Sequence, residues 1–283
     1  MEPISFTTAL ASIPAIFTSC VDCYHYVQIG RAFERDYGMV LCKLEASELR
    51  LTRWGKAMGI TGPDSRLSAS LYGEHEIITA YNWLKEIQTA FTTAFEPPLG
   101  FKKRVTPEEF SPLDQNPATN ATNEPYSSLH KTMRKIIDGR LTPRKRDRIA
   151  WALHKREDYE SLVGNISELV NNLIELFHST TDQQARLCQE EAQSMDSDAL
   201  RSMGSIIGGQ DQALQYHMRE EINKRKINVK FFQATEHFQG HIGDNNVTSV
   251  GQASDIDMGT VLGSGHSTLH IGTNFASVGS ARH

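Results

Sequence analysis

The sequence predicts an all-α helical globular domain followed by a C-terminal tail of a different character. Over about the first 220 residues, apolar side chains recur at helical spacing, which predicts a bundle with a sizeable core. From Ile227 onward the chain has no proline, few charges and many Gly, Asn, Ser and Thr residues. That composition is typical of a tail that is disordered as a monomer and forms stacked cross-β layers in an assembly. We therefore expect a helical domain over residues 1–222 and an assembling tail over residues 223–283.

Composition narrows the possible functions. A formal net charge of −5 gives no basic surplus for binding nucleic acid. The four cysteines lack the spacing of a disulfide framework, and no basic segment precedes the apolar N-terminus as in a secretory signal. We therefore expect a cytoplasmic protein. Cys20 and Cys23 form a CxxC without a second pair or a βαβ context, and we interpret them as ordinary thiols.

The N-terminal segment is the most apolar part of the helical region. Residues 3–21 carry no charged side chain, and as a helix they would be roughly 28 Å long, close to the hydrocarbon thickness of a bilayer. One apolar face recurs at helical spacing: Phe6, Leu10, Ile13 and Phe17. In the resting protein we expect this helix to pack on the bundle, with a bend at Pro14. Once released, it is uncharged enough to enter a membrane.

Further helices follow along the chain. Apolar stripes and caps predict them over residues 37–60, over 73–94, up to about 138, from Thr142-Pro143 onward, over 182–203 and over 209–226. Residues 96–125 hold six of the ten prolines and predict a long loop. Eight basic residues between Lys131 and Arg148 predict a solvated face or, alternatively, a surface attracted to an anionic membrane.

The tail contains one pattern twice, with corresponding residues 29 positions apart, from Phe232 to Gly243 and from Val261 to Gly272. Within each copy, apolar and polar residues alternate with the period of a strand. Six pairs coincide in identity or chemistry: Phe232/Val261, His237/His266, His241/His270, Ile242/Ile271, Gly243/Gly272 and Asn245/Asn274. Two short repeats cannot bury an apolar face alone, so we expect the missing layers to come from other copies of the chain.

The sequence contains no catalytic constellation: no phosphate-binding glycine loop, no nucleophile elbow and no carboxylate pair in a recognisable context. We therefore expect neither an enzyme nor a cofactor. One alternative is a zinc-binding interaction protein. His237 and His241, and likewise His266 and His270, are four residues apart and would share a face, which brings four imidazoles within reach of one metal.

Several strings resemble a known family. Four of them are similar to the HeLo domain of the fungal HET-s/HET-S prion proteins: Cys20–Arg31, Arg35–Tyr37, Arg53–Gly55 and Ala150–Leu153. The tail resembles the prion-forming domain of the same proteins, and the two matches cover nearly the whole chain in the same order. The resemblance implies a HeLo-like bundle with a tail that becomes a β-solenoid when it assembles as amyloid. Its two repeats would span about 228–246 and 257–275.

The resemblance also implies a function, namely an amyloid-templated cell-death effector in heterokaryon incompatibility. A matching amyloid motif on another copy, on a homologous tail or on an NLR-type receptor would template the tail. Folding of the tail would destabilise the HeLo domain and release the N-terminal segment, which would form pores in an anionic cell membrane. The alternative within the family is a non-toxic prion partner that shares the amyloid fold but lacks pore formation. Ala32 lies where the two allelic types differ, and the sequence leaves both open.

Matching by position assigns three groups of functional residues. The membrane-inserting residues would be Ile4, Phe6, Leu10, Ile13, Ile16 and Phe17. The amyloid core would consist of Phe232, Phe238, Ile242, Gly243, Val261, Leu269, Ile271, Gly272 and Phe275. The ladder between layers would contain His237, His241, His266, His270, Asn245 and Asn274. Two departures from the family argue against cross-seeding with relatives: His237 meets His266 where the family pairs opposite charges, and Gly240 replaces a core aliphatic residue.

Overall fold

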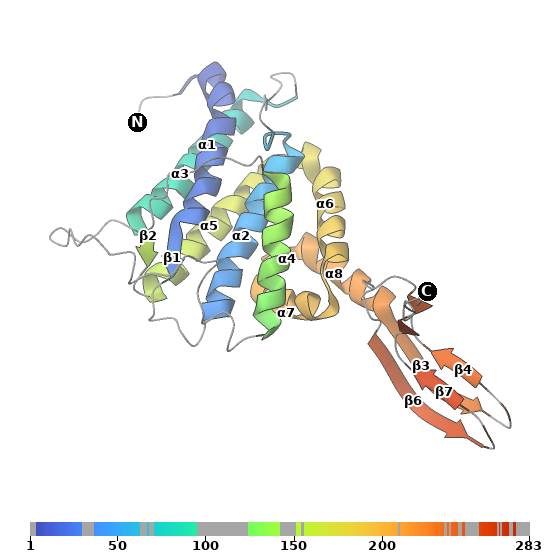
Figure 1. Cartoon of the computed structure of the whole chain (residues 1–283). Coiled ribbons are helices and arrows are strands. Elements are labelled where there is room, and N and C mark those ends of the chain that lie inside the picture. Colours follow the sequence, from blue (N-terminus) through green and yellow to red (C-terminus); the bar gives the residue numbers. More distant parts are fainter. Residues whose placement is uncertain are drawn as a thin grey trace, which may run out of the picture.

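The structure, a computed structural model, is helical over most of residues 6–225 and forms strands beyond them (Figure 1). It describes residues 4–29, 37–62, 67, 71–94, 124–141, 151–153, 156–208, 210–234, 237, 239–242, 245–246, 255–264, 266, 268–271 and 274–275. The helices are α1 (Phe6–Tyr26), α2 (Tyr37–Ala57), α3 (Glu74–Ala94), α4 (Glu124–Arg140), α5 (Arg156–Leu176), α6 (Thr181–Ser194), α7 (Ser197–Ile207) and α8 (Gln212–Arg225), with a 3₁₀ turn at His178–Thr180. The strands are β1 (Val27–Ile29), β2 (Trp151–Leu153), β3 (Lys226–Ala234), β4 (Gln239–Ile242), β5 (Asn245–Asn246), β6 (Asp255–Gly263), β7 (Thr268–Ile271) and β8 (Asn274–Phe275).

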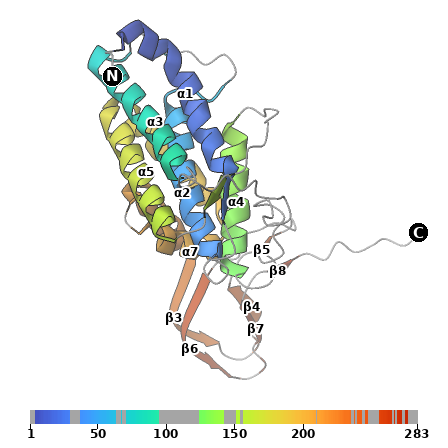
Figure 2. The same cartoon turned by 90° about the vertical axis from the view of Figure 1, so that its left-hand side faces the viewer.

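Helix α2 lies at the centre of the bundle and packs against α1, α4, α5, α6 and α7. On one side, α1, α3 and α5 enclose an apolar cluster that includes Trp54 of α2 (Figures 1 and 2). On the other side, α4, α6, α7 and α8 enclose a second apolar cluster that includes Leu49 of α2. Because α2 is buried on both sides, its own polar residues have to find partners inside the protein.

Local sequence rules account for the helices that surround α2. The buried residues of α3 follow the spacing of one helical face: Ile77, Ala80, Leu84, Ile87 and Phe91. At its start, the backbone N–H of Gly73 donates to the Glu76 carboxylate at 2.7 Å. At α7, Asp196 accepts from the Ala199 N–H at 2.7 Å, and Gly208 has a φ of 50° just past the last helical residue. These are the residue types that begin and end helices elsewhere.

The predicted helical domain is confirmed, and two local predictions are wrong. Residues 151–153 form β2, which pairs in parallel with β1, so α5 begins at Arg156 rather than at the predicted Thr142-Pro143. Val, Ile and Trp favour this strand pairing over a continued helix. The predicted helix over 182–203 is two helices, because Asp196 caps α7 and stops α6 short of it. Residues 95–123, which hold most of the predicted proline-rich loop, lie outside the described part of the chain.

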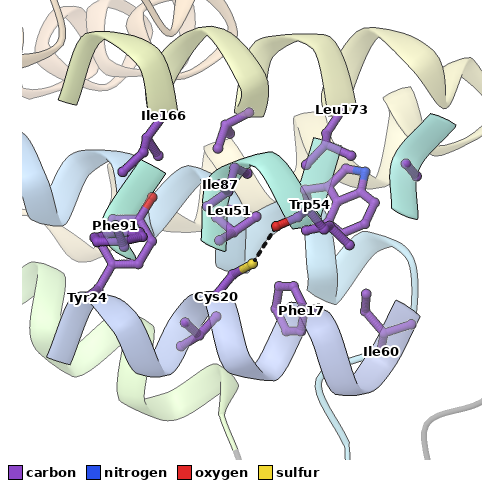
Figure 3. Packing of buried hydrophobic residues seen from close by; sticks show 14 of the residues in the cluster. Phe17, Cys20, Tyr24, Leu51, Trp54, Ile60, Ile87, Phe91, Ile166 and Leu173 are labelled. Atoms are coloured by element: carbon purple, nitrogen blue, oxygen red, sulfur yellow. Dashed lines mark hydrogen bonds between the residues drawn. The ribbon is translucent and has the colours of Figure 1, made fainter. Parts of the chain in front are cut away.

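A glycine sets the distance between α1 and α2. A Cβ atom at Gly55 of α2 would overlap the ring of Phe17 of α1. Phe17 is only 1% exposed, and its ring centroid lies 6.1 Å from that of Trp54. Figure 3 shows Phe17 pointing from α1 toward Trp54, with Leu51 and Ile87 nearby. The Phe17 ring therefore occupies the space that a side chain at Gly55 would need.

Gly55→Ala should destabilise the helical domain, because the added methyl group overfills a packed contact. We expect a loss of about 1–3 kcal/mol in the free energy of unfolding, measured by denaturant titration followed by far-UV circular dichroism. Gly139→Ala is the matched control, since a Cβ at Gly139 of α4 meets no atom within 4 Å and alanine favours the helix. Equal stability of Gly55→Ala and Gly139→Ala would contradict the close approach of α1 to α2.

Candidate functional site

Helix α1 is the N-terminal segment that was predicted to insert into membranes, and here it packs on the bundle. Ser5 caps its start by accepting from the Thr8 N–H. Two of the predicted membrane-inserting residues, Ile13 and Phe17, are buried in the core. The other four are partly buried against the same cluster: Ile4, Phe6, Leu10 and Ile16. The apolar face is rotated slightly from the prediction, since the small residue Ala9 is buried and Leu10 is not fully so.

Polar contacts hold the C-terminal half of α1, where the Ser19 hydroxyl accepts from the Gln88 side chain at 2.8 Å. Near its C-terminal end the Tyr24 hydroxyl and the Ser47 Oγ lie 2.9 Å apart, and the Cys20 thiol donates to the Leu84 carbonyl at 3.1 Å (Figure 3). Apolar packing dominates elsewhere, for example between the Tyr24 and Phe91 rings at 4.8 Å. By length and composition alone, the 20 residues Phe6–His25 are enough to cross a bilayer. A buried helix of a soluble protein meets the same criterion, so α1 is compatible with both environments.

The two thiols of the CxxC lie on α1 and are free cysteines. Burial is the main reason that the pKa of both thiols is raised, to about 11 for Cys23 and further for Cys20. Both are therefore protonated at neutral pH and unreactive, as expected of ordinary thiols.

Helix α2 carries a buried row of charged residues that the sequence analysis did not find. One group joins α2 to α4: Arg134 of α4 binds both Glu45, at 2.8 Å, and Glu48. His130 of α4 lies 2.8 Å from Glu45, and His25 of α1 lies 3.2 Å from Glu48. Burial raises the pKa of Glu45. Burial also acts to raise the pKa of Glu48, but Arg134 and His25 bring that pKa below its ordinary value.

The second group of charges lies one turn further along α2. Arg53 binds Glu191 of α6 at 2.5 Å and Asp211, which precedes α8, at 2.8 Å. Arg140 of α4 binds the same Glu191 at 2.5 Å. Asp211 also accepts from the Leu214 N–H at 3.2 Å and so caps α8. A single arginine on α2 therefore fixes the positions of α6 and α8.

These pairs correct the interpretation of the basic run between Lys131 and Arg148. Arg134 and Arg140 are internal ion-pair partners and do not belong to a solvated or membrane-facing surface. Lys131 and Lys135 of α4 are exposed, and residues 142–150 lie outside the described part of the chain. The sequence does contain a signal for these internal pairs. The predicted helix that carries the apolar stripe also carries acidic and basic residues, between Glu45 and Arg53. Charged residues are rarely buried without partners, and the partners are far away in the sequence.

Helix α8 connects the bundle directly to the tail. Its last residue, Arg225, is 8% exposed and donates to the carbonyls of Met195, at 2.7 Å, and Gln193, at 3.4 Å. Strand β3 begins at the next residue, Lys226, and the strands project away from the helices (Figure 1). The sequence boundary at 222/223 thus falls inside α8. Asp211 at the start and Arg225 at the end hold α8 to the bundle.

The two repeats of the tail pair with each other in parallel, in the predicted register. Strands β3, β4 and β5 pair with β6, β7 and β8, each residue meeting the one 29 positions further on. The Cα partners include Phe232↔Val261, His241↔His270, Ile242↔Ile271 and Asn245↔Asn274. Phe275 lies opposite Asn246, and Gly240 lies opposite Leu269. The 29-residue repeat is therefore a structural one. That the tail orders only on assembly stays a prediction.

The register also contains a pair of opposite charges that the sequence comparison of the repeats missed. Lys226 of β3 lies opposite Asp255 of β6. At the position where the family pairs opposite charges, the His237 and His266 rings lie 5.7 Å apart between centroids. Extending the 29-residue offset back to the start of β3 would have found Lys226 and Asp255.

The paired repeats leave apolar side chains in contact with water. Val261, Leu262 and Ile271 are 44%, 49% and 44% exposed, respectively. Two of these three belong to the predicted amyloid core. Large apolar side chains on a strand pair need a further layer to cover them. Three other predicted core residues, Phe238, Gly243 and Gly272, lie outside the described residues.

The described residues do not support a zinc site. Within them, no group of three or more His, Cys, Asp or Glu side chains could hold a metal ion. The rings of His237 and His266 lie 5.7 Å apart between centroids, and His241 pairs with His270 in the register of β4 and β7.

Comparisons with known proteins identify the helical region. Residues 6–203 match the model of the HeLo family, described as prion-inhibition and propagation. Heterokaryon incompatibility protein s of Podospora anserina is 24% identical over 98% of both chains, and protein S of the same species is equally similar over the same shares.

Two solved structures of the HET-s N-terminal domain share the fold. One, a double mutant of that domain, has a TM-score of 0.63 at 22% identity and covers 75% of this chain and 98% of its own. The other has a TM-score of 0.62 at 23% identity and covers 75% and 97%. These matches confirm the predicted family, its helical domain and its non-enzymatic character.

Asp211→Asn should loosen α8 and change how stability depends on pH. Asparagine keeps the cap but removes the charge that faces Arg53, so we expect a loss of about 3–5 kcal/mol in unfolding free energy at pH 7. Burial acts to raise the pKa of Asp211, but Arg53 and Arg50 bring it below the ordinary 3.8. A carboxyl whose folded pKa is depressed contributes stability above its unfolded pKa and loses it as pH falls toward the folded value. The wild-type chain should therefore lose stability below about pH 4, and Asp211→Asn should show a smaller pH slope there.

Denaturant titrations between pH 3 and pH 7 measure both effects. Asp198→Asn is the matched control, because the Asp198 side chain is 75% exposed in its pair with Arg201, and we expect a change below about 1 kcal/mol. An Asp211→Asn chain as stable as Asp198→Asn would show that the Arg53 pair does not hold α8.

Proposed function

Because the chain belongs to the HeLo family, we propose that it is a prion-type cell-death effector that acts in heterokaryon incompatibility. The observation that carries the proposal is the structure of the tail. Two repeats pair in parallel at a constant offset, leave Val261 and Ile271 about half exposed, and continue directly from α8. A tail of this kind is suited to assembly with other copies of itself. The curated relatives, which are named heterokaryon incompatibility proteins, match along nearly the whole chain, tail included.

The first step of the proposed mechanism is templating. A second copy of the tail adds its β3 to the open edge of β6, because both edges present the same register of backbone groups. Each addition covers the apolar side chains of one layer and exposes those of the next. The tail of a homologous protein, or a matching motif on an NLR-type receptor, serves as the first template. The assembled tail is a β-solenoid that grows as amyloid.

The second step transmits assembly to the helical domain. Arg225 and Lys226 are adjacent, so ordering the tail in a fibre constrains the end of α8. Stacked copies are spaced about 4.8 Å per layer, too close for every helical domain to remain docked around its own tail. Crowding then pulls α8 away and separates Asp211 from Arg53. The loss leaves buried charges unpaired in α2, which destabilises the bundle.

The third step releases α1. Its apolar face, with Ile13 and Phe17 at the centre, leaves the core and enters an anionic membrane, where several copies form a pore. The protein is cytoplasmic while soluble or aggregated and moves to the cell membrane on activation. In the alternative role within the family, a non-toxic prion partner, the first step occurs without the third.

Ile242→Pro should abolish assembly of the tail. Proline removes a donor from β4 and distorts the strand at the position that pairs with Ile271. We expect residues 219–283 to form fibres when seeded and the Ile242→Pro tail to form none, as measured by thioflavin fluorescence and electron microscopy. Ile242→Val is the matched control and should assemble like the wild type, because it keeps a β-branched apolar side chain. Seeded growth of the proline variant at the wild-type rate would refute the strand assignment.

Leu10→Lys should block membrane entry without affecting the tail. A charge at the centre of a bilayer costs at least about 2.5–3.5 kcal/mol, whereas Leu10→Met conserves an apolar side chain of similar volume. We expect seeded full-length Leu10→Lys protein to form fibres but to release little dye from anionic vesicles, and the Leu10→Met control to release it fully. Undiminished leakage with the lysine variant would exclude α1 as the membrane-inserting element. Fibres without leakage in the wild type would identify the non-toxic prion partner.

A further inference from the structure

A cavity of about 330 Å³ opens between α2, α5 and α7. Its volume lies at the lower end of the range of small-molecule sites. One wall consists of Lys43, Ser47 and Arg50, which lie on one face of α2. Gly164 and Ser167 of α5 line a second wall, and the last turn of α7 lines the third.

Three donors on this lining have no acceptor among the described residues. Arg50 is 5% exposed, and one of its terminal nitrogens, Nη2, donates to the Asn171 side chain. Its other terminal nitrogen, Nη1, is buried and makes no hydrogen bond within the described part of the chain. Ser167 is 4% exposed, and its hydroxyl likewise has no protein partner in the described ranges. Neither does the ammonium group of Lys43 form an ion pair with any described residue. Of the three, the Arg50 Nη1 is the buried atom, and buried donors without acceptors are rare in folded proteins unless a ligand or water satisfies them.

The buried charges near the cavity are also unbalanced. Arg50, Arg53 and Arg140 share only two carboxylates, those of Glu191 and Asp211, among the described residues. Arg50 is the most weakly paired of the three arginines, because Asp211 lies 2.8 Å from Arg53 but 3.7 Å from Arg50. A buried charge without a counter-ion is costly, and an anion in the cavity would remove that cost at Arg50.

The opposite side of the cavity favours a hydroxylated group over a second anion. Ser205 and Gly208 line it at the C-terminal end of α7, where carbonyl groups lack partners within the helix, and Glu160 of α5 also lines the cavity. The negative end of the helix dipole points the same way. A suitable ligand is therefore anionic at one end and carries hydroxyl donors at the other.

We propose that this cavity binds a small organic phosphate monoester, with its phosphate against Lys43, Arg50 and Ser167 and its hydroxyl groups toward the end of α7. The unpartnered donors come from two helices, α2 and α5, and suit the several oxygens of a tetrahedral phosphate. The ligand would also touch Gln210, which lines the cavity and immediately precedes Asp211. Occupancy therefore stabilises the folded helical domain, including the turn that leads into α8, by mass action. This site does not depend on the proposed function.

Gly164 provides a variant that blocks the cavity without breaking a contact. It is an exposed glycine inside α5, and a Cβ built on it meets no atom within 4 Å. Gly164→Leu introduces a good helix former whose side chain covers the mouth of the cavity. Gly139→Leu on α4 is the matched control, because a Cβ there meets no atom either. Lys43→Gln has an equivalent control in Lys56→Gln, at an exposed lysine of α2 outside the cavity.

Glycerol 3-phosphate is the probe, and glycerol and sodium chloride at equal ionic strength are its controls. Calorimetric titration and thermal unfolding of the full-length chain should show saturable binding and a rising Tm with glycerol 3-phosphate alone. Lys43→Gln should weaken binding roughly 10- to 100-fold, the contribution of one hydrogen bond to a charged group. Gly164→Leu should abolish binding while keeping the Tm of the unliganded protein at or above the wild-type value. Both control variants should bind like the wild type.

Vesicle flotation separates a soluble ligand from a lipid headgroup of the same chemistry. Phosphatidylcholine vesicles that contain phosphatidic acid present a phosphate monoester, and vesicles with phosphatidylserine match their charge without it. Selective binding to phosphatidic acid that is lost in Lys43→Gln and Gly164→Leu would assign the site to a lipid headgroup. Binding of glycerol 3-phosphate without vesicle selectivity would assign it to a soluble phosphate. No response to either probe, or binding that both cavity variants retain, would overturn the proposal.

Discussion

A guanidinium group and two carboxylates meet in the centre of the bundle, where Arg53 of α2 binds Glu191 of α6 and Asp211 ahead of α8. Placing these groups out of water is expensive, and their mutual attraction does little more than offset the cost. What these groups contribute is to fix where the helices lie relative to one another. An apolar contact between helices tolerates sliding, whereas a buried ion pair is satisfied only in one arrangement. This cluster fixes α6 and the start of α8, and Arg225 fixes the end of α8 from which the tail begins.

Helices α1 and α8 are attached to the bundle by different forces. Helix α8 is fixed at its start by Asp211 and at its end by Arg225, whose guanidinium binds the carbonyl groups that end α6. Helix α1 is held mainly by apolar packing, with Phe17 and Ile13 almost fully buried, and its contact with a carboxylate, between His25 and Glu48, lies in its last turn. Hydrocarbon is as good a solvent as the protein core for that face, so α1 loses little apolar stabilisation when it exchanges one for the other. Ion pairs have no such alternative partner. On the proposed mechanism, an event at α8 is therefore costly enough to change the bundle, and α1 is the helix able to leave.

Sequence patterns predicted the features that repeat and missed those that depend on distant partners. Helical spacing found α2 and α3 nearly to the residue, and the 29-residue repeat gave the register of Ile242 with Ile271 before any strand was seen. The short β1–β2 pair was missed, because three residues carry no periodicity and their pairing joins Val27 to Trp151 across the chain. The buried charges were missed for a related reason. Helical periodicity assigns Glu45 and Arg53 to a helix face. It does not show that Arg134 and Glu191, from other helices, form ion pairs with them.

The register of the tail determines what kind of assembly it can make. Lys226 opposite Asp255 and Ile242 opposite Ile271 belong to one continuous set of parallel pairs with the same offset throughout. The outer edge of β6 therefore presents to a neighbour the same kind of surface that its inner edge presents to β3. Contacts of this head-to-tail type do not close into a dimer but continue as an open filament. On the proposed mechanism each added chain restores the same edge, because the offset between the two layers is constant. The proposed self-propagation follows from this offset, since a chain whose two layers match each other also matches its own copies.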